Sequence, residues 1–280
     1  MCGLIRTRGK QSCQRPGCLE SRWTEVQGLT LHARVSGAAV PSSTPTVVLV
    51  HGLGVSSRYM VPTARLLAPD YHVYAPDLPG FGKSAKPTHV LNIAELTDAL
   101  VAWMGAVGLD RVVMLGNSMG CQIIADCAVR YPERVERAVL VGPTMDSQGR
   151  TALRQAWRVL RDTPREAPSQ PFVVAADYLQ AGLLRAWHTL QYALADAIEE
   201  KLPRVRVPVL VVRGEHDPVV PQRWAAEVTR LLPRSQLVVI PGGAHTVNYS
   251  SPRELVRVVR PFLSDGQGTK TPPIGLSSIN

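Results

Sequence analysis

The stretch Arg111-Val-Val-Met-Leu-Gly-Asn-Ser-Met-Gly120 decides the fold of this chain. It begins with a short β-branched apolar run at 112–115, which predicts a strand buried on both faces. A Gly-x-Ser-x-Gly turn centred on Ser118 follows directly, and residues 121–130 have the apolar spacing of a helix. Strand, tight turn and helix form the context in which this motif exposes a nucleophilic serine. Glycine is expected on both sides because a Cβ there would collide with the neighbouring strand and helix.

Two loops further along the chain carry the partners that a nucleophilic serine needs. The hydroxyl needs a base, and the base needs a carboxylate that orients it. Residues 207–212 predict a buried strand that runs into a loop containing Asp217, and a strand predicted at 236–240 runs into a loop containing His245. We therefore predict Ser118, His245 and Asp217 as a catalytic triad. His216, next to Asp217, would point the opposite way in an extended segment and is not expected to be the base.

An earlier strand, predicted at 46–50, ends in His51-Gly-Leu-Gly54. Acyl transfer requires hydrogen-bond donors for a tetrahedral oxyanion, and backbone N–H groups in a tight glycine turn can supply them. We predict the backbone N–H groups of Leu53 and Met119 as these donors. The alternative is that His-Gly is only a strand-ending turn. We interpret His51 as structural in either case.

The composition of the 280-residue chain is that of a globular protein, with 45% hydrophobic residues and a mean hydropathy near zero. No apolar run reaches the ~20 residues of a membrane span. The net charge is +9, but residues 1–22 carry four of those charges and the rest are scattered arginines. We therefore expect a solvated surface and no nucleic-acid partner. The five cysteines show no zinc-site spacing, so we expect no metal, unpaired thiols and a cytoplasmic location.

The remaining pattern divides the chain into a core, an insertion and two ends. Residues 1–21 are expected to be a disordered leader and 265–280 a disordered tail. The core, 22–142 and 207–264, contains further strands predicted at 23–26, 29–35, 72–75 and 137–141, and helices at 57–67, 93–107 and 251–263. The insertion, 143–206, contains helical patterns at 151–161, 173–188 and 190–201.

Five segments in this order resemble the α/β-hydrolase superfamily: His51-Gly52, Asp77-Leu-Pro-Gly-Phe-Gly82, Gly116-Asn-Ser-Met-Gly120, Gly214-Glu-His-Asp217 and Gly243-Ala-His245. The resemblance implies an α/β fold with a mostly parallel eight-stranded sheet, helices on both faces and a helical lid formed by the insertion. It also implies the chain order serine, acid, histidine. Some members keep the acid after the strand that precedes the lid, which makes Asp146 the alternative to Asp217.

The same resemblance limits the reaction. Relatives that are epoxide hydrolases or dehalogenases have aspartate at the elbow, where this chain has Ser118. Asn117 resembles the hydrolases of meta-cleavage products, which break C–C bonds, but Thr246 follows His245 where those enzymes have tryptophan. We therefore predict a serine esterase that acts on small to medium acyl groups without a cofactor. A C–C hydrolase, a non-hydrolytic ligand receptor and a haloperoxidase-like oxidation remain alternatives.

The lid would form the acyl pocket. Its large side chains Trp157, Tyr178, Leu184 and Trp187 are the candidates to line that pocket, although packing of the lid on the core explains each of them equally well. The expected partner is a small-molecule ester, and the protein is expected to be a monomer or a homodimer.

Overall fold

A computed structural model describes residues 5–6, 15, 17–37 and 40–264 of the chain. Within these residues nine strands form one sheet in the order β1-β2-β3-β5-β4-β6-β7-β8-β9. Their bounds are β1 Ile5–Arg6, β2 Leu19–Val26, β3 Leu29–Ser36, β4 Thr46–Val50, β5 His72–Pro76, β6 Val112–Asn117, β7 Val135–Val141, β8 Val209–Gly214 and β9 Ser235–Ile240.

The sheet is parallel from β5 to β9 and antiparallel at its other end, where β1, β2, β3 and β5 pair in turn. The prediction of a mostly parallel sheet is confirmed, and each of the eight predicted strands corresponds to one of β2 to β9. The two-residue strand β1 is added at the edge. Because β2 begins at Leu19, the fold starts before the predicted boundary at residue 22. Of the predicted leader before β2, the structure describes only Ile5, Arg6, Arg15, Gly17 and Cys18. The predicted tail lies outside the described residues.

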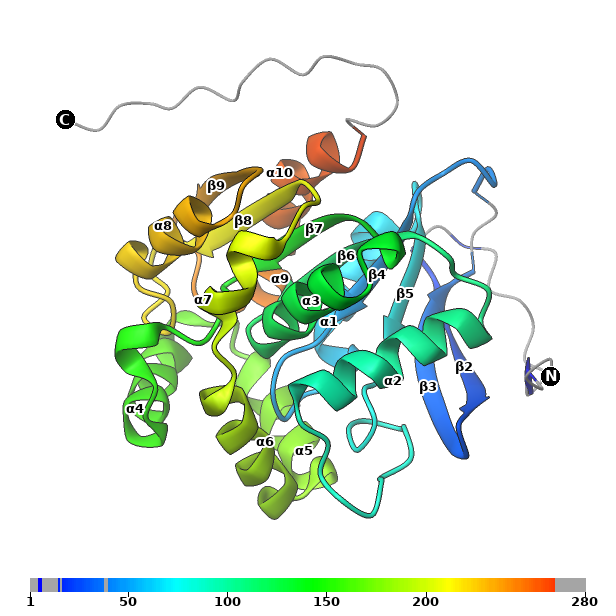
Figure 1. Cartoon of the computed structure of the whole chain (residues 1–280), viewed down its shortest axis with the longest axis horizontal. Coiled ribbons are helices and arrows are strands. Elements are labelled where there is room, and N and C mark those ends of the chain that lie inside the picture. The colour runs from blue at the N-terminus through cyan, green and yellow to red at the C-terminus, as the bar shows by residue number, and fades with distance from the viewer. Residues whose placement is uncertain (1–4, 7–14, 16, 38–39, 265–280) are drawn as a thin grey trace.

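Helices cover both faces of the sheet (Figure 1). Side chains from α2, α3 and α8 form one buried cluster with the sheet, and side chains from α1, α9 and α10 form the other. The bounds of these helices are α1 Ser57–Leu67, α2 Ile93–Ala106, α3 Met119–Arg130, α8 Gln222–Leu231, α9 Val247–Ser250 and α10 Pro252–Ser264.

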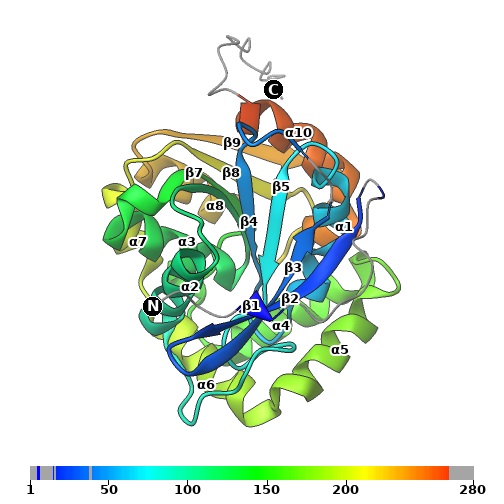
Figure 2. The same cartoon turned by 90° about the vertical axis from the view of Figure 1, so that its right-hand side faces the viewer.

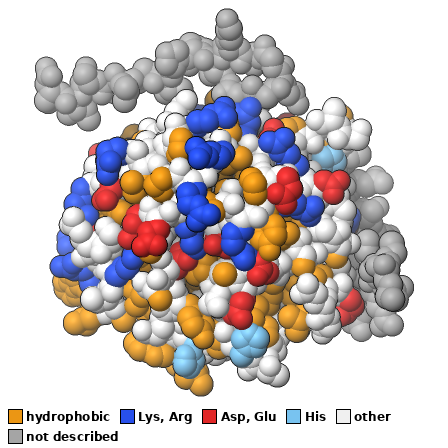
Figure 3. All heavy atoms as spheres, in the orientation of Figure 1, with side chains coloured by type: hydrophobic (Ala, Val, Ile, Leu, Met, Phe, Trp, Pro, Cys, Tyr) orange, Lys and Arg blue, Asp and Glu red, His pale blue; other side chains and the backbone are white. Residues whose placement is uncertain are grey.

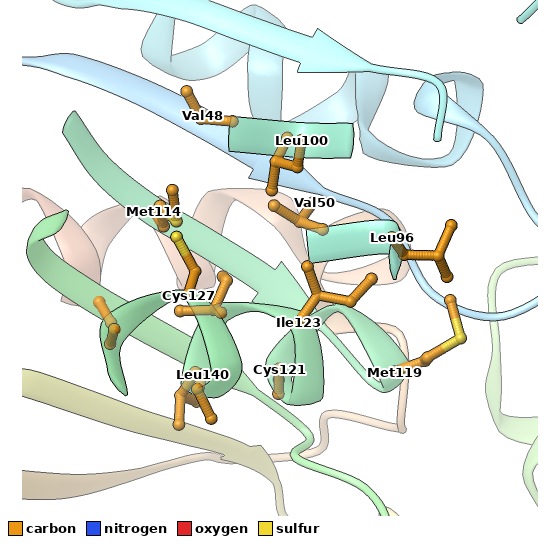
Figure 4. Close-up of a cluster of buried hydrophobic side chains, with 14 of the residues drawn as sticks. Val48, Val50, Leu96, Leu100, Met114, Met119, Cys121, Ile123, Cys127 and Leu140 are labelled. Carbon is orange, nitrogen blue, oxygen red and sulfur yellow. The ribbon is translucent and has the colours of Figure 1, made fainter. Parts of the chain in front are cut away.

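The two clusters follow from the alternation of side chains along each strand. In β4, Val48 and Val50 belong to the α2–α3 cluster, whereas Val47 and Leu49 belong to the α1–α10 cluster. Figure 4 shows Val48 and Val50 beside side chains from α2 and α3. Because both faces are covered, the central strands contain continuous apolar runs, such as Val112–Leu115 in β6 and Val209–Val212 in β8. Each fully buried aliphatic side chain contributes about 1.5–3 kcal/mol relative to exposure.

The insertion consists of four helices, α4 Ala152–Asp162, α5 Gln170–Ala181, α6 Leu183–Ala195 and α7 Ile198–Lys201. The predicted helix at 173–188 is wrong, because Gly182 adopts a φ of +94° and separates α5 from α6. Only glycine adopts this conformation readily. Helices α4, α5 and α6 lie together at one end of the sheet in both views (Figures 1 and 2).

The loop Asp77–Gly82 is one of the five segments that resemble the α/β-hydrolase superfamily. Its first residue, Asp77, forms hydrogen bonds with three separate segments of the chain. The Asp77 carboxylate accepts hydrogen bonds from His32 Nδ1 at 2.7 Å, from the Ser57 amide at 2.6 Å and from the Lys83 amide at 2.8 Å. These three donors come from β3, from the start of α1 and from the loop itself. Asp77 thus joins the N-terminal hairpin to the parallel core.

The described cysteines differ in their pairing. Cys121 and Cys127 are free and buried on α3, but Cys18 is disulfide-bonded, so the expectation of unpaired thiols is wrong at that position.

Among the described residues, no helix has the length and apolar character required to cross a membrane.

Candidate active site

Ser118 occupies a sharp turn between β6 and α3. Its backbone has φ 57° and ψ −122°, a conformation that non-glycine residues rarely adopt. The turn fits only because glycine flanks it. A Cβ at Gly120 would lie 2.4 Å from the carbonyl oxygen of Val50 in β4, and one at Gly116 would lie 2.8 Å from the backbone of Gly120. The collision predicted from the sequence is therefore present at both glycines, and the strained turn stands between a strand and a helix, as the sequence predicted.

His245 and Asp217 lie side by side on the loops that follow β9 and β8. The Nδ1–H group of His245 donates a hydrogen bond of 2.9 Å to Oδ2 of Asp217. The other carboxylate oxygen accepts hydrogen bonds from the backbone N–H groups of Val219 at 2.7 Å and Val220 at 2.9 Å. Both side chains are buried. This arrangement fixes the histidine ring and leaves Nε2 for a second partner. Ser118 and His245 line the same pocket.

Asp146, the alternative acid, has different partners. Its carboxylate accepts hydrogen bonds from Arg158 at 2.7 Å and from both terminal nitrogens of Arg223 at 2.6 and 3.0 Å. Burial would raise the pKa of Asp146, but the two guanidinium groups keep it below its ordinary value. The carboxylate of Asp146 is therefore bound by two arginines. The carboxylate that contacts His245 is that of Asp217.

Two further carboxyl groups, which sequence reasoning missed, lie beside the histidine loop. The backbone N–H of His245 donates to Asp162 Oδ1 at 3.1 Å, and the backbone N–H of Thr246 donates to Glu166 Oε1 at 2.7 Å. Glu166 also accepts hydrogen bonds from the hydroxyls of Thr246 and Ser250. Asp162 lines the pocket. The two acids come from the end of α4 and the turn that follows it, about 80 residues away along the chain.

This concentration of acids changes how the histidine titrates. Burial alone would lower the pKa of His245, but the charge of Asp217 and its hydrogen bond, with additional charge from Asp162 and Glu166, raises it to about 9. Burial raises the pKa of Asp162 to about 8, helped by Glu166 and opposed by His245. The imidazolium form is therefore stabilised here.

The two predicted oxyanion donors each follow a central strand, Leu53 after β4 and Met119 after β6. Leu53 lines the pocket, and Met119 is the first residue of α3, where amide groups lack partners within the helix. A Cβ at Gly52 would lie 3.3 Å from the Cβ of Ser118, so the Gly52 backbone passes close to the serine. His51 donates from Nδ1 to the Gly52 carbonyl at 2.8 Å and accepts the Leu78 N–H at Nε2 at 3.0 Å. Both ring nitrogens are used, which fits a structural role.

The pocket has a cavity volume of about 130 Å³ and is open to solvent. Core loops form one side and the insertion forms the other. The lining residues are Gly52, Leu53, Val55, Tyr59, Asn117, Ser118, Thr144, Met145, Gln155, Val159, Asp162, Gln170, Val174, Tyr178, Leu190, Val219, His245 and Thr246.

Of the four large side chains expected in the pocket, Tyr178 is among the lining residues. The expectation is wrong for Trp157, Leu184 and Trp187, whose exposed fractions are 58%, 72% and 51%. Helix geometry explains the difference, because α4 turns Gln155, Val159 and Asp162 inward at a spacing of three to four residues. Trp157 then lies on the opposite side.

The described residues contain no group of three or more His, Cys, Asp or Glu side chains arranged to hold a metal ion.

The chain is similar in sequence to known proteins. Residues 47–258 match the model of a family described as the alpha/beta hydrolase family. A putative carbamate hydrolase, RutD, of Pseudomonas syringae pv. syringae (strain B728a) is 27% identical over 248 residues, which cover 79% of this chain and 94% of the relative.

Two solved structures show the same fold. A bacterial membrane phospholipase A has a TM-score of 0.76 and 23% identity, with 90% of this chain and 88% of that chain covered. The enol-lactonase from Burkholderia xenovorans LB400 has a TM-score of 0.72 and 22% identity, with 86% of this chain and 99% of that chain covered.

Proposed function

The chain belongs to the alpha/beta hydrolase family, and from this premise we propose that it is a serine hydrolase of carboxylic esters with small to medium acyl groups. The observation that carries the proposal is the hydrogen bond between His245 and Asp217, 2.9 Å long, in the pocket that Ser118 lines. A serine, a histidine with its Nδ1 proton held by a carboxylate, and an elbow turn are the parts that acyl transfer requires.

On this proposal the reaction proceeds in two halves. His245 Nε2 accepts the Ser118 hydroxyl proton while the serine oxygen attacks the ester carbonyl, and the alcohol leaves with the proton that His245 returns. The amides of Leu53 and Met119 stabilise the oxyanion. His245 then takes a proton from water, which attacks the acyl-enzyme and releases the acid. Asp217 holds the histidine tautomer and stabilises the imidazolium throughout.

The apolar lining of the pocket supports the proposed acyl group. Aliphatic side chains from both sides line it, including Val55, Met145, Val174 and Leu190. In this proposal residues 143–206 act as the lid, because this segment contributes half of the lining residues.

The test is a panel of p-nitrophenyl esters from acetate to palmitate, read as burst and steady-state release of nitrophenol. We expect a burst equal to the enzyme concentration and an acyl adduct on Ser118 by peptide mass spectrometry. Ser118→Ala should abolish both and keep the wild-type melting temperature, because no hydrogen bond of its hydroxyl holds the fold together. An adduct on another residue would exclude Ser118 as the nucleophile.

The same panel separates the alternative functions. A ligand receptor would bind the esters and release no nitrophenol. A C–C hydrolase would leave the esters nearly untouched and cleave a vinylogous diketone. Adding a carbamate and an enol lactone to the panel covers the reactions named for the relatives.

A further inference from the structure

The insertion exposes an unusual amount of apolar surface. Eleven large hydrophobic side chains are exposed among the described residues, and all but Val239 of β9 lie on α4, α5 and α6. Leu153 and Phe172 are the most exposed, at 83% and 78%. We call this surface the outer face; its core is Leu153, Trp157 and Leu160 on α4, Phe172 on α5, and Leu184 and Trp187 on α6.

These residues form one surface because their helices are neighbours: α4 and α5 each contact α6. Figure 3 shows hydrophobic side chains gathered along the lower edge of the molecule, where Figure 1 places α4, α5 and α6. Large contiguous apolar patches on a protein surface mark interaction sites. The same helices turn their other sides to the pocket and the core, so the outer face has no partner within the described part of the chain.

Charge indicates the kind of partner. Between residues 150 and 195 the chain has three acids, Asp162, Glu166 and Asp177, and all three are buried. Asp177 is paired with Arg58 and Ser56, while Asp162 and Glu166 hold the histidine loop. In contrast, Arg154, Arg161 and Arg165 are exposed. The surface of this segment therefore combines apolar side chains with cations and shows no carboxylate.

We propose that the outer face is a docking surface for an anionic phospholipid membrane. Tryptophan and leucine beside exposed arginine are the residues with which amphipathic helices bind in the plane of a bilayer surface. Arginine near such a surface is attracted by anionic lipid headgroups. A second copy of the chain is a poorer fit, because a two-fold pairing of this face would bring each arginine group against its own copy.

Docking in this orientation would bring the pocket to the membrane. Val159 of α4 is 53% exposed and also lines the pocket that contains Ser118. The outer face therefore continues into the rim of the pocket. The membrane proposal itself rests on the surface alone and does not depend on the catalytic assignment.

The test is flotation of the full chain with vesicles of phosphatidylcholine, with and without phosphatidylglycerol. The Ser118→Ala variant is used so that lipid hydrolysis cannot alter the vesicles. We expect binding that requires phosphatidylglycerol and weakens with salt. Tryptophan emission should shift to the blue on binding, because Trp157 and Trp187 are exposed whereas Trp103 and Trp224 are buried.

Matched variants locate the surface. The triple variant L153S/W157S/L160S should bind phosphatidylglycerol vesicles at least about tenfold more weakly, whereas V239S should bind as the parent does. R154Q/R161Q should lose roughly tenfold, whereas R230Q/R257Q, which removes two exposed arginines elsewhere, should lose little. Equal melting temperatures show that all variants are folded.

Three results would overturn the proposal. One is the absence of vesicle binding by the parent, and another is binding that the α4 variants leave unchanged. The third is a dimer, measured by light scattering, that the L153S/W157S/L160S variant dissociates, because the outer face would then belong to a second copy.

Discussion

The backbone N–H of His245 donates a hydrogen bond of 3.1 Å to the carboxyl group of Asp162, which lies 83 residues earlier in the chain. This contact joins the insertion to the loop that carries the proposed catalytic base. It also brings a second carboxyl group, beside that of Asp217, close to one imidazole. The insertion therefore influences the electrostatics of the site as well as the shape of the pocket.

The first prediction concerns pH. A carboxylate favours the imidazolium, and only neutral His245 can accept the serine proton. Because the pKa of His245 is raised to about 9, activity should rise with pH over a range above the ordinary histidine value. The pKa of Asp162 is about 8, so its carboxyl group is negatively charged mainly above that pH. Asp162→Asn keeps the hydrogen-bond acceptor and removes this charge, so it should lower the pKa of His245 and increase kcat/KM mainly between about pH 8 and 9. The measurement is kcat/KM on one ester from pH 5 to 10.

The control is Asp110→Asn, since Asp110 is a fully exposed carboxylate. Its profile should coincide with that of the wild type. If Asp162→Asn has the same profile as well, Asp162 does not affect the titration of the base.

The second prediction identifies the acid of the triad. Asp217→Asn keeps the shape of the side chain but favours the wrong histidine tautomer, which in serine proteases costs about 10⁴ in turnover. We expect a comparable loss here. Asp146→Asn should retain most of the turnover per folded molecule, because its partners are Arg158 and Arg223. Turnover is measured at a temperature at which circular dichroism shows both variants folded; the opposite ranking would assign the acid to Asp146.

Asp146→Asn should nevertheless have a lower free energy of unfolding than the wild type. It leaves Arg158, whose side chain is 12% exposed, without its charged partner, whereas Arg223, at 42%, is solvated. The cost should therefore lie below that of breaking a fully buried ion pair, about 3–5 kcal/mol. Urea unfolding measures this cost independently of activity.

The third prediction concerns the elbow. Gly120→Ala should prevent folding or destabilise the protein by several kcal/mol, since its Cβ would lie 2.4 Å from the Val50 carbonyl oxygen and neither backbone can move freely. Gly105→Ala on α2 is the control, because its Cβ would have only the end of Arg134 nearby, at 3.7 Å. Alanine is the better helix former by up to about 1 kcal/mol, so this variant should match or exceed wild-type stability. Thermal melts of both proteins decide the matter.

The fourth prediction concerns acid stability. Burial would raise the pKa of Asp77, but His32 and the amides of Lys83 and Ser57 hold it well below the ordinary value of 3.8. A lowered folded pKa contributes stability above the unfolded value and loses it as pH falls toward the folded pKa. Asp77→Asn should therefore cost about 2–4 kcal/mol at pH 7. In urea unfolding the difference from wild type should narrow below about pH 4; a difference independent of pH would contradict the assignment.

Much of the fold was predictable because its core obeys local rules. The apolar run at 46–50 and the helix at 57–67 have the predicted bounds, since strands buried on both faces and amphipathic helices leave clear patterns. The elbow was predictable for a related reason, because Gly116 and Gly120 record a steric requirement in the sequence itself. The contact between Asp217 and His245 followed from the adjacency of β8 and β9.

The burial of side chains in the insertion was less predictable, because large hydrophobic residues are exposed there. Trp157 and Trp187 were expected to point inward, yet both are exposed. Gly182 carried a signal for the helix break that the surrounding helical pattern concealed. Asp162 and Glu166 lie in a helical end and turn with no motif, and their partners are about 80 residues away, so only the folded chain brings them to His245 and Thr246.

The carboxyl groups of Asp162 and Glu166 also set a condition for exchanging segments between relatives. A foreign insertion grafted in place of 143–206 would leave the amides of His245 and Thr246 without their acceptors unless it brought two acids to the same places. The histidine loop and the insertion are therefore one module, although the sequence separates them by β8, α8 and β9. Recombination that keeps these two segments from one parent should give active chimeras more often than recombination that divides them.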